Sequence, residues 1–164
     1  MVLILITSGL VVLIIWLWFL IQGAPHVQTK TDDAEIILTA AIKHKPKRIL
    51  DMGSGNGRIV LLLAKNGFCV DGIEINPIHV WIARRNIKDA GLTGKASIKW
   101  GSFWNYDVSN YDMVTMYAIQ HIMPKLETKL TKELKPGSIV VSNFFTFPNK
   151  KPHKTHNRIN VYKF

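Results

Sequence analysis

The sequence predicts an α/β fold in which a parallel sheet carries helices on both faces, preceded by one transmembrane helix. From residue 32 onward, short apolar strands alternate with amphipathic helices. A glycine-rich loop joins the first strand to the helix that follows it. Residues 2–21 contain no charged residue and no proline. A chain of 164 residues fits one ordinary domain behind such a segment.

The N-terminal apolar segment is long enough to cross a bilayer. At about 1.5 Å per residue, a helix over residues 2–21 spans about 30 Å, the thickness of a hydrocarbon core. Trp16 and Trp18 lie near its end, where indoles favour the membrane interface. A cleaved signal peptide is the alternative, but the apolar run exceeds the usual length of roughly 7–15 residues, and no basic residue precedes it. We therefore predict a single-pass anchor over residues 1–22.

The charge lies entirely in the domain that follows. The chain has 21 Lys and Arg against 11 Asp and Glu, a net charge of +10, and residues 1–21 carry none of it. The positive-inside rule then places the domain on the cytoplasmic or organellar matrix side of the membrane. A basic domain is attracted to an anionic lipid surface, nucleic acid or an acidic partner, and composition does not choose among them. The single cysteine, Cys69, excludes a disulfide scaffold, and we expect it to be a buried small apolar residue.

Turn, cap and breaker residues divide the domain into elements. Residues 23–31 are expected to be a linker, and residues 32–164 the folded domain. The expected helices, which share apolar residues at helical spacing, are residues 33–43, 58–66, 77–90 and 124–135. Thr31 or Asp32 caps the first, and Pro46 stops it. Gly67 ends the second, and the third begins at Pro77 and ends at Gly91. The expected strands are short apolar runs, residues 48–52, 68–75, 96–100, 111–117, 138–145 and 159–164. Residues 149–157 are polar and basic, and we expect a mobile loop there.

The segment that indicates chemistry is residues 51–57 (DMGSGNG), between the first strand and the next helix. Glycines let the backbone turn with positive φ and approach a ligand closely. The loop lies at the carboxyl end of a strand, where open α/β sheets bind ligands, and the helix N-terminus behind it favours a carboxylate. Glu74, at the end of the second strand, can accept hydrogen bonds from both hydroxyls of a ribose.

Two cofactors fit a glycine loop with a ribose-binding acid. A dinucleotide loop has glycine at the sixth position of G-x-G-x-x-G, where this chain has Arg58. Asp51 would repel a pyrophosphate but favours a ligand with a cation, such as the amino group of S-adenosylmethionine. A Walker A loop is excluded because no Gly-Lys-Ser/Thr follows. The sequence therefore predicts S-adenosylmethionine as the cofactor.

Four segments occur in order at suitable spacing: DMGSGNGRIVLLLA, GIEINP, YDMVTMYAIQHIMPKL and LKPGSIVVSNFF. Together they resemble the Rossmann-like class I S-adenosylmethionine-dependent methyltransferases. Within that class they are similar to a small membrane-anchored group. The group includes the mitochondrial lysine methyltransferases that act on the ATP synthase c subunit and on the adenine nucleotide translocase, and similar bacterial proteins. The resemblance covers residues 25–164. Because the C-terminal end is short, we expect the usual antiparallel strand pair at the sheet edge to be incomplete.

The resemblance also implies site residues. Those that would hold the cofactor are Thr29, Asp51, Gly53, Ser54, Gly55, Gly57, Glu74, Asn76, Ser102 and Phe103. Tyr117 and Asn143 would be catalytic and, with Ser142, would line the transfer channel. The group usually has an acid where Ser102 stands, and its loss should weaken cofactor binding without abolishing it.

The predicted function is protein-lysine N-methylation of a membrane protein, because an anchor confines the enzyme to the bilayer of its substrate. The aromatic side chains of Trp104, Tyr117, Phe144 and Phe145 could form the apolar pocket that favours a neutral amine. A lipid or small-molecule methyltransferase remains an alternative, as does a catalytically silent cofactor-binding or RNA-binding module. An Asn/Asp-Pro-Pro-Tyr/Phe motif is missing after the fourth strand, which disfavours nucleic-acid bases. The pair His153 and His156 has no Cys or acidic partner nearby in sequence, so no metal site is predicted.

Overall fold

The structure is a computed structural model, and it describes residues 7, 9–12, 29 and 31–164. Almost all of the predicted anchor, residues 1–22, and of the predicted linker, residues 23–31, lies outside the described residues. Among the residues that are described, no helix combines the length and the apolar character that crossing a membrane requires.

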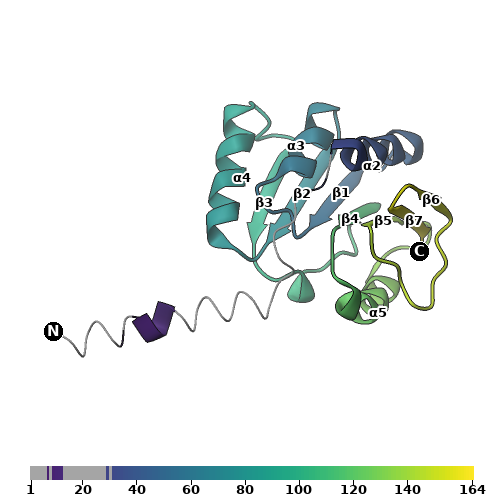
Figure 1. Cartoon of the computed structure of the whole chain (residues 1–164). Coiled ribbons are helices and arrows are strands. Elements are labelled where there is room, and N and C mark those ends of the chain that lie inside the picture. The colour runs from purple at the N-terminus through teal and green to yellow at the C-terminus, as the bar shows by residue number, and fades with distance from the viewer. Residues whose placement is uncertain (1–6, 8, 13–28, 30) are drawn as a thin grey trace.

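A seven-stranded sheet forms the centre of the domain, with strand order β3-β2-β1-β4-β5-β7-β6 (Figure 1). The strands are β1 (Arg48–Met52), β2 (Cys69–Glu74), β3 (Ala96–Trp100), β4 (Met113–Met116), β5 (Ile139–Asn143), β6 (Lys154–His156) and β7 (Ile159–Lys163). Strands β1 to β5 pair in parallel, whereas β7 is antiparallel to both β5 and β6. The parallel strands therefore share one carboxyl edge, where their last residues meet.

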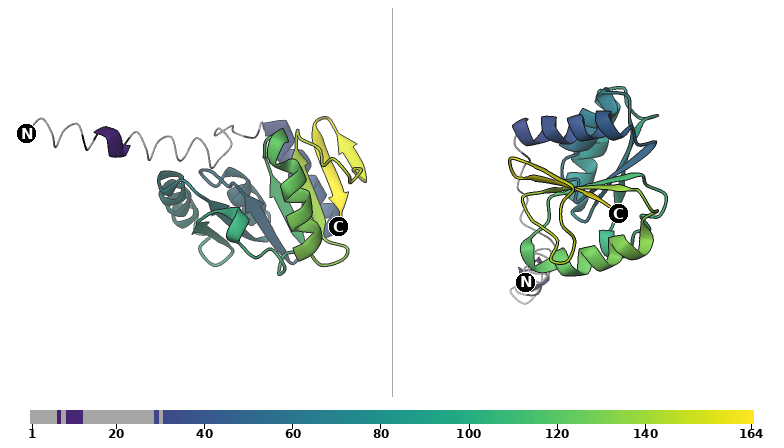
Figure 2. Two further views of the ribbon diagram at one scale, coloured as in Figure 1. Left: turned by 90° about the horizontal axis from the view of Figure 1, so that it is seen from below. Right: turned by 90° about the vertical axis from the view of Figure 1, so that its right-hand side faces the viewer.

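Helices cover both faces of the sheet, as the sequence predicts (Figure 2). The helices are α2 (Thr31–His44), α3 (Arg58–Lys65), α4 (Pro77–Asp89) and α5 (Met123–Glu133), with two short 3₁₀ turns, η1 (Phe103–Asn105) and η2 (Gln120–Ile122). The first three pack on one face, and α5 packs on the other. Within residues 31–164, each predicted helix and strand is present, and its ends differ from the prediction by at most two residues.

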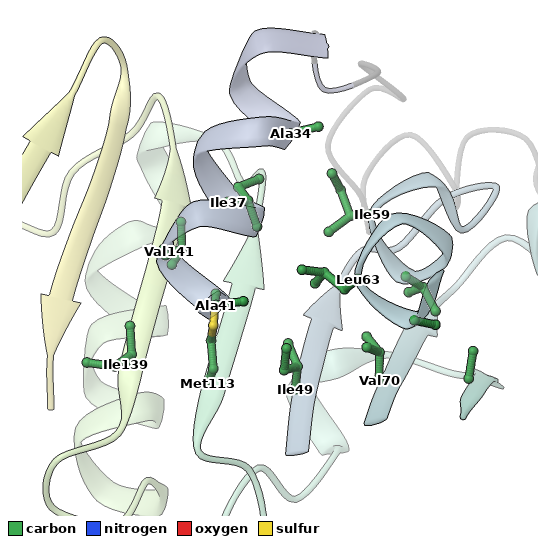
Figure 3. Close-up of a cluster of buried hydrophobic side chains, with 14 of the residues drawn as sticks. Ala34, Ile37, Ala41, Ile49, Ile59, Leu63, Val70, Met113, Ile139 and Val141 are labelled. Atoms are coloured by element: carbon green, nitrogen blue, oxygen red, sulfur yellow. The ribbon is translucent and has the colours of Figure 1, made fainter. Parts of the chain in front are cut away.

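The core lies in two layers because the side chains of each strand alternate between the faces. On the face shown in Figure 3, Ala34, Ile37 and Ala41 of α2 and Ile59 and Leu63 of α3 pack against the strands. The strand side chains on this face are those of Ile49, Val70, Met113, Ile139 and Val141. Burial on both faces explains why the central strands read as nearly continuous apolar runs.

The C-terminal edge differs from the prediction. Residues 149–157 are not simply a loop, because Lys154–His156 forms β6 and pairs with β7. The antiparallel pair is therefore present, and the expected shortening of the sheet is wrong. All three residues of β6 are exposed, so no apolar burial marks it as a strand; besides its backbone pairing, the hydroxyl of Thr155 donates to the Oδ1 of Asn160 in β7 at 3.0 Å. Asn157, with φ of 52°, turns the chain between the two strands.

Cys69 also differs from the prediction, since its thiol is exposed and free. It is the first residue of β2, and burial in this strand begins at Val70. A strand residue at the amino edge of the sheet lies at the rim, where apolar composition does not ensure burial.

Candidate functional site

The pairing of the strands brings the predicted site residues to one edge. β1 pairs in parallel with β2 on one side and with β4 on the other, and β4 pairs in parallel with β5. Neighbouring strands lie about 4.8 Å apart. The residues that end or directly follow these strands therefore stand side by side along the carboxyl edge; from β2 to β5 they are Glu74, Gly53, Tyr117 and Asn143. Open α/β sheets bind ligands at this edge.

The glycine loop follows β1 and turns through left-handed backbone conformations. Gly53 has φ of 78°, and a Cβ added there would meet no heavy atom within 4 Å. Gly57 has φ of 82°, and an added Cβ would lie 3.0 Å from the Cβ of Ala83 in α4. Gly57 therefore permits close packing of the loop on α4, whereas at Gly53 the described residues leave the space beside the Cα open.

Gly72, inside β2, is a site residue that the sequence analysis missed. A Cβ at Gly72 would lie 2.6 Å from both the Oγ of Ser54 and the Cδ1 of Ile98. The backbone N–H groups of Gly53 and Ser54 both donate to the carbonyl of Ile73, at 2.9 and 3.1 Å. The loop thus lies directly on β2. A glycine within an apolar strand was the available signal, because it marks close approach of another segment.

Glu74 connects the glycine loop to the turn before α4. Its Oε2 accepts from the N–H of Gly55 at 2.9 Å, and its Oε1 accepts from the N–H of Asn76 at 2.8 Å. The side chain of Asn76 caps α4 by accepting from the N–H of Ile78 at 2.9 Å. A carboxylate has about four lone-pair positions, so Glu74 keeps acceptor capacity for ribose hydroxyls.

Asp51 is a buried carboxyl group on β1, next to the glycine loop. Burial raises its pKa to about 7; the hydrogen bond from the hydroxyl of Thr115, at 2.7 Å, opposes that rise, and the nearby charge of Glu74 adds to it. A positive group beside Asp51 would favour the ionised form. The site therefore suits a ligand with a cationic part, as the sequence predicts for S-adenosylmethionine.

Two buried polar side chains at this edge are unsatisfied. Within the part of the chain that the structure describes, neither the hydroxyl of Ser54 nor the amide of Asn143 has a hydrogen-bond partner. An unsatisfied buried polar group costs about 1–3 kcal/mol. Such groups are uncommon in folded proteins.

Aromatic side chains stand beside Asn143. The rings of Tyr117 and Phe145 lie 6.4 Å apart between centroids, and those of Phe144 and Phe145 lie 4.9 Å apart. Phe144 has φ of 76°, a strained conformation for a bulky residue, and its side chain is 53% exposed. Its N–H donates to the carbonyl of Arg158 at 2.8 Å. Trp104 lies in a different pair, with Phe103 at 4.9 Å, under the ammonium group of Lys125.

The remaining predicted cofactor residues lie around the same edge. Ser102 precedes η1 and caps it, because its Oγ accepts from the N–H of Trp104 at 3.3 Å. Arg58, at the start of α3, donates to the carbonyl of Thr29 at 2.5 Å and to the hydroxyl of Thr31 at 3.0 Å. Arg58 thus holds the chain before α2 against the glycine loop, a role that the sequence analysis did not assign.

The two closely spaced histidines, His153 and His156, lie at the C-terminal edge of the sheet. His156 lies in exposed β6, and the backbone N–H of His153 donates to the carbonyl of Val161 at 2.8 Å. Among the described residues, no three side chains of His, Cys, Asp or Glu cluster as metal ligands would.

Comparison with known proteins places this fold and loop in a family. Residues 51–154 match the family described as the ANTKMT methyltransferase domain. The ATP synthase c-subunit lysine N-methyltransferase of Mus musculus is 37% identical over 131 residues, which are 80% of this chain and 53% of that protein. A protein-lysine N-methyltransferase of Saccharolobus islandicus is 37% identical over 135 residues, covering 80% of this chain and 83% of that protein. The chain spans about half the length of the mouse and rat relatives, 53% of each.

A solved structure supports the same placement. The RNA methyltransferase from Salinibacter ruber, in complex with S-adenosyl-L-homocysteine, superposes with a TM-score of 0.77 at 32% identity and covers 84% of this chain and 92% of its own. The predicted class I methyltransferase fold and the predicted cofactor are confirmed. The chain belongs to the ANTKMT methyltransferase domain family, whose sheet and glycine loop are those of an S-adenosylmethionine-dependent class I methyltransferase.

Proposed function

We propose that this protein is a membrane-anchored, S-adenosylmethionine-dependent protein-lysine N-methyltransferase that acts on a membrane protein. The observation that carries the proposal is the buried amide of Asn143, which has no partner within the described chain. Asn143 ends β5, two strands from the strand that precedes the glycine loop, and the aromatic rings of Tyr117 and Phe145 lie near this end of the sheet. Two relatives that are 37% identical are named lysine N-methyltransferases, which supports lysine as the acceptor. The apolar character of residues 2–21 supports the anchor.

The β1–β2 side of the edge would hold the methyl donor. When bound, S-adenosylmethionine supplies an electrophilic methyl group. Glu74 would accept hydrogen bonds from the ribose hydroxyls, and Asp51 would be held ionised by the positive charge beside it. Gly53 leaves the loop backbone open to close approach, and the hydroxyl of Ser54 would gain the partner that it lacks within the described chain.

The side formed by the ends of β4 and β5 would hold the lysine. An amine with an unperturbed pKa of about 10.4 must lose its proton before it can attack a methyl group. Tyr117 and Phe145 would exclude water, and such desolvation lowers the pKa of an amine. The Oδ1 of Asn143 would accept a hydrogen bond from the amine and orient its lone pair. This arrangement requires no dedicated general base.

RNA methylation is the second candidate. The solved structure at 32% identity is named an RNA methyltransferase, and the net charge of +10 would favour binding to a polyanion. The missing Asn/Asp-Pro-Pro-Tyr/Phe motif after β4 stands against methylation of a base. A lipid or small-molecule acceptor remains a further alternative.

The test uses the full chain in membranes with radiolabelled S-adenosylmethionine, followed by separation of protein, lipid and RNA. We expect label on lysine in a discrete protein band. The matched control is Asn143→Ala, which should lose most of the transfer while it keeps cofactor affinity. Label only in lipid would discard the lysine assignment, and label only in RNA would establish the second candidate. Cofactor binding with no label in any fraction would indicate a silent binding module.

A further inference from the structure

We propose that the carboxyl edge of the sheet docks on the surface of an anionic lipid bilayer through the outward face of α4 and through Trp100. This inference rests on the proposed function, which places the substrate in a membrane. It is argued from exposed side chains of α4 and β3 to which the proposed methyl transfer assigns no role. It concerns the folded domain itself, in addition to the predicted anchor.

Exposed apolar side chains gather at this edge. Within residues 31–164, the large apolar side chains that are more than half exposed are Ile42, Ile78, Trp81, Trp100 and Phe144. All but Ile42 lie at the carboxyl edge or in the helical turns next to it: Trp100 ends β3, Phe144 follows β5, and Ile78 and Trp81 lie in the first turns of α4. An apolar cluster on one edge indicates an interaction surface.

The outward face of α4 changes in character along its length. Ile78, Trp81, Arg85 and Lys88 are exposed and follow one another at helical spacing, while Val80, Ala83 and Ile87 face the core. The outward stripe of a surface helix is normally polar throughout. Here it is apolar nearest the carboxyl edge and charged farther from it, where Arg85 and Lys88 are followed by the exposed Asp89. At about 1.5 Å per residue, the stripe extends over about 15 Å.

This order matches the layers of a bilayer surface. Ile78 would lie deepest, the indole of Trp81 would lie at the interface that tryptophan favours, and Arg85 and Lys88 would lie among the headgroups. The guanidinium of Arg85 lies 5.8 Å from the centre of the Trp81 ring. Arg84 does not belong to the stripe, because its guanidinium donates to the carbonyl of Ile98 at 2.8 and 3.0 Å.

Trp100 extends the surface from α4 to the sheet, since α4 packs beside the edge strand β3 (Figure 1). Its Nε1 donates to the carbonyl of Ile75 at 3.0 Å, yet 67% of the residue is exposed. The hydrogen bond holds the indole at the carboxyl edge, beside the turn that leads from β2 into α4.

The chain enters the domain at the same edge. Arg58 holds the carbonyl of Thr29 beside the glycine loop. Seven residue steps lead from the end of the predicted anchor to Thr29, and they can reach about 25 Å at most, because an extended chain spans at most about 3.3–3.6 Å per residue. An anchor ending at residue 22 would therefore keep this edge close to the bilayer.

The charges and the tryptophans together favour an anionic lipid surface. The folded domain carries all of the net charge of +10. On the stripe, Arg85 forms an ion pair with Asp89 at 3.6 Å, and both side chains are exposed. Each Lys or Arg near an anionic leaflet contributes about 1 kcal/mol to binding. Tryptophan at the edge and cations behind it are the features that a lipid surface recognises.

The test measures the depth of a fluorophore in vesicles of phosphatidylcholine with phosphatidylserine, using the full chain. Cys69 is exposed at the amino edge and is the single cysteine, so the wild-type protein labelled at Cys69 reports on the opposite edge. In a Cys69→Ser background, Ile78→Cys, Trp81→Cys, Arg85→Cys and Lys88→Cys place the label along the stripe. Ile42→Cys, in the last turn of α2, is a second control at the amino edge.

We expect spin-labelled lipids to quench the fluorophore several-fold more strongly at Ile78→Cys than at Cys69, with quenching that declines from Ile78→Cys to Lys88→Cys. Ile78→Cys keeps Trp81 and Trp100, so it tests docking without removing the tryptophans. Equal quenching at Ile78→Cys, Ile42→Cys and Cys69 in folded, cofactor-binding protein would overturn the proposal. Quenching at Ile78→Cys that requires an added protein would also overturn it. So would quenching that is equally strong in vesicles of phosphatidylcholine alone. Methyl transfer without quenching refutes only docking, and quenching without transfer refutes only the proposed function.

Discussion

On the β1–β2 side of the carboxyl edge, the buried carboxylates of Asp51 and Glu74 both accept hydrogen bonds, whereas on the β4–β5 side the buried amide of Asn143 has no partner within the described chain. Glu74 accepts from the N–H groups of Gly55 and Asn76, and Asp51 accepts from Thr115. Asn143 has no partner within the described chain, and Phe144 next to it has strained backbone. Under the proposed function, the two carboxylates are already held in place by the chain, whereas Asn143 would gain a partner only from a substrate.

The largest expected effect is the loss of cofactor affinity in the Glu74→Ala variant. This change removes the acceptor for two backbone N–H groups and for the ribose, and hydrogen bonds to a charged group contribute about 1.5–3 kcal/mol each. We expect cofactor affinity to fall at least about 100-fold, as measured by calorimetry. Glu74→Gln keeps one acceptor oxygen and should bind with intermediate affinity. Unchanged affinity in Glu74→Ala would show that this carboxylate does not bind the cofactor.

The contrasting change on the other side is Asn143→Ala. We expect methyl transfer to fall about 10- to 100-fold, because an oriented hydrogen bond to the amine is lost, with cofactor affinity unchanged. The free energy of unfolding should change little, since the amide has no partner within the described chain whose loss would cost energy. Single-turnover rates and thermal unfolding measure the two quantities. Parallel losses of cofactor affinity and transfer would mean that the two sides are not separable.

The pH dependence of cofactor affinity sharpens the comparison through Asp51. If its carboxylate must be ionised to face a cation, a pKa of about 7 makes affinity about tenfold weaker at pH 6 than at pH 8. The folded pKa exceeds the unfolded value of about 3.9, so the ligand-free protein should lose stability as pH rises from about 4 to about 7 and then level off. Asp51→Asn should remove both dependences. An affinity that does not change across this range in the wild type would contradict the assignment of a cation beside Asp51.

The smallest expected effect comes from the strained residue. Phe144→Gly should relieve the positive φ and raise the free energy of unfolding by about 1 kcal/mol, while removal of the exposed ring raises KM for the acceptor severalfold. Phe144→Ala is the matched control, since it removes the ring and keeps the strain. Chemical denaturation and acceptor titration separate the two contributions. Equal stability of the Gly and Ala variants would mean that this conformation carries no strain.

The order of helices and strands could be predicted from the sequence because both faces of the central strands are buried. Burial on both faces makes each strand an apolar run, and Pro77, Gly67 and Gly91 mark the ends of helices. β6 could not be predicted, because its three residues are exposed and polar and leave no apolar pattern in the sequence. The predicted burial of Cys69 is wrong for a related reason: strand composition does not say where the covering helices stop.

The sequence by itself determined the glycine loop, the acids at the ends of β1 and β2, and the alternation that places them at one edge. These follow from local rules, since parallel strands put their carboxyl ends together. Only the tertiary structure decided that the side chain of Ser54 packs against Gly72 and that Arg58 donates to the carbonyl of Thr29. It also decided that the amide of Asn143 has no partner within the described chain. The physical reason is that contacts between residues far apart in sequence depend on how elements pack, and side-chain type alone does not fix that packing.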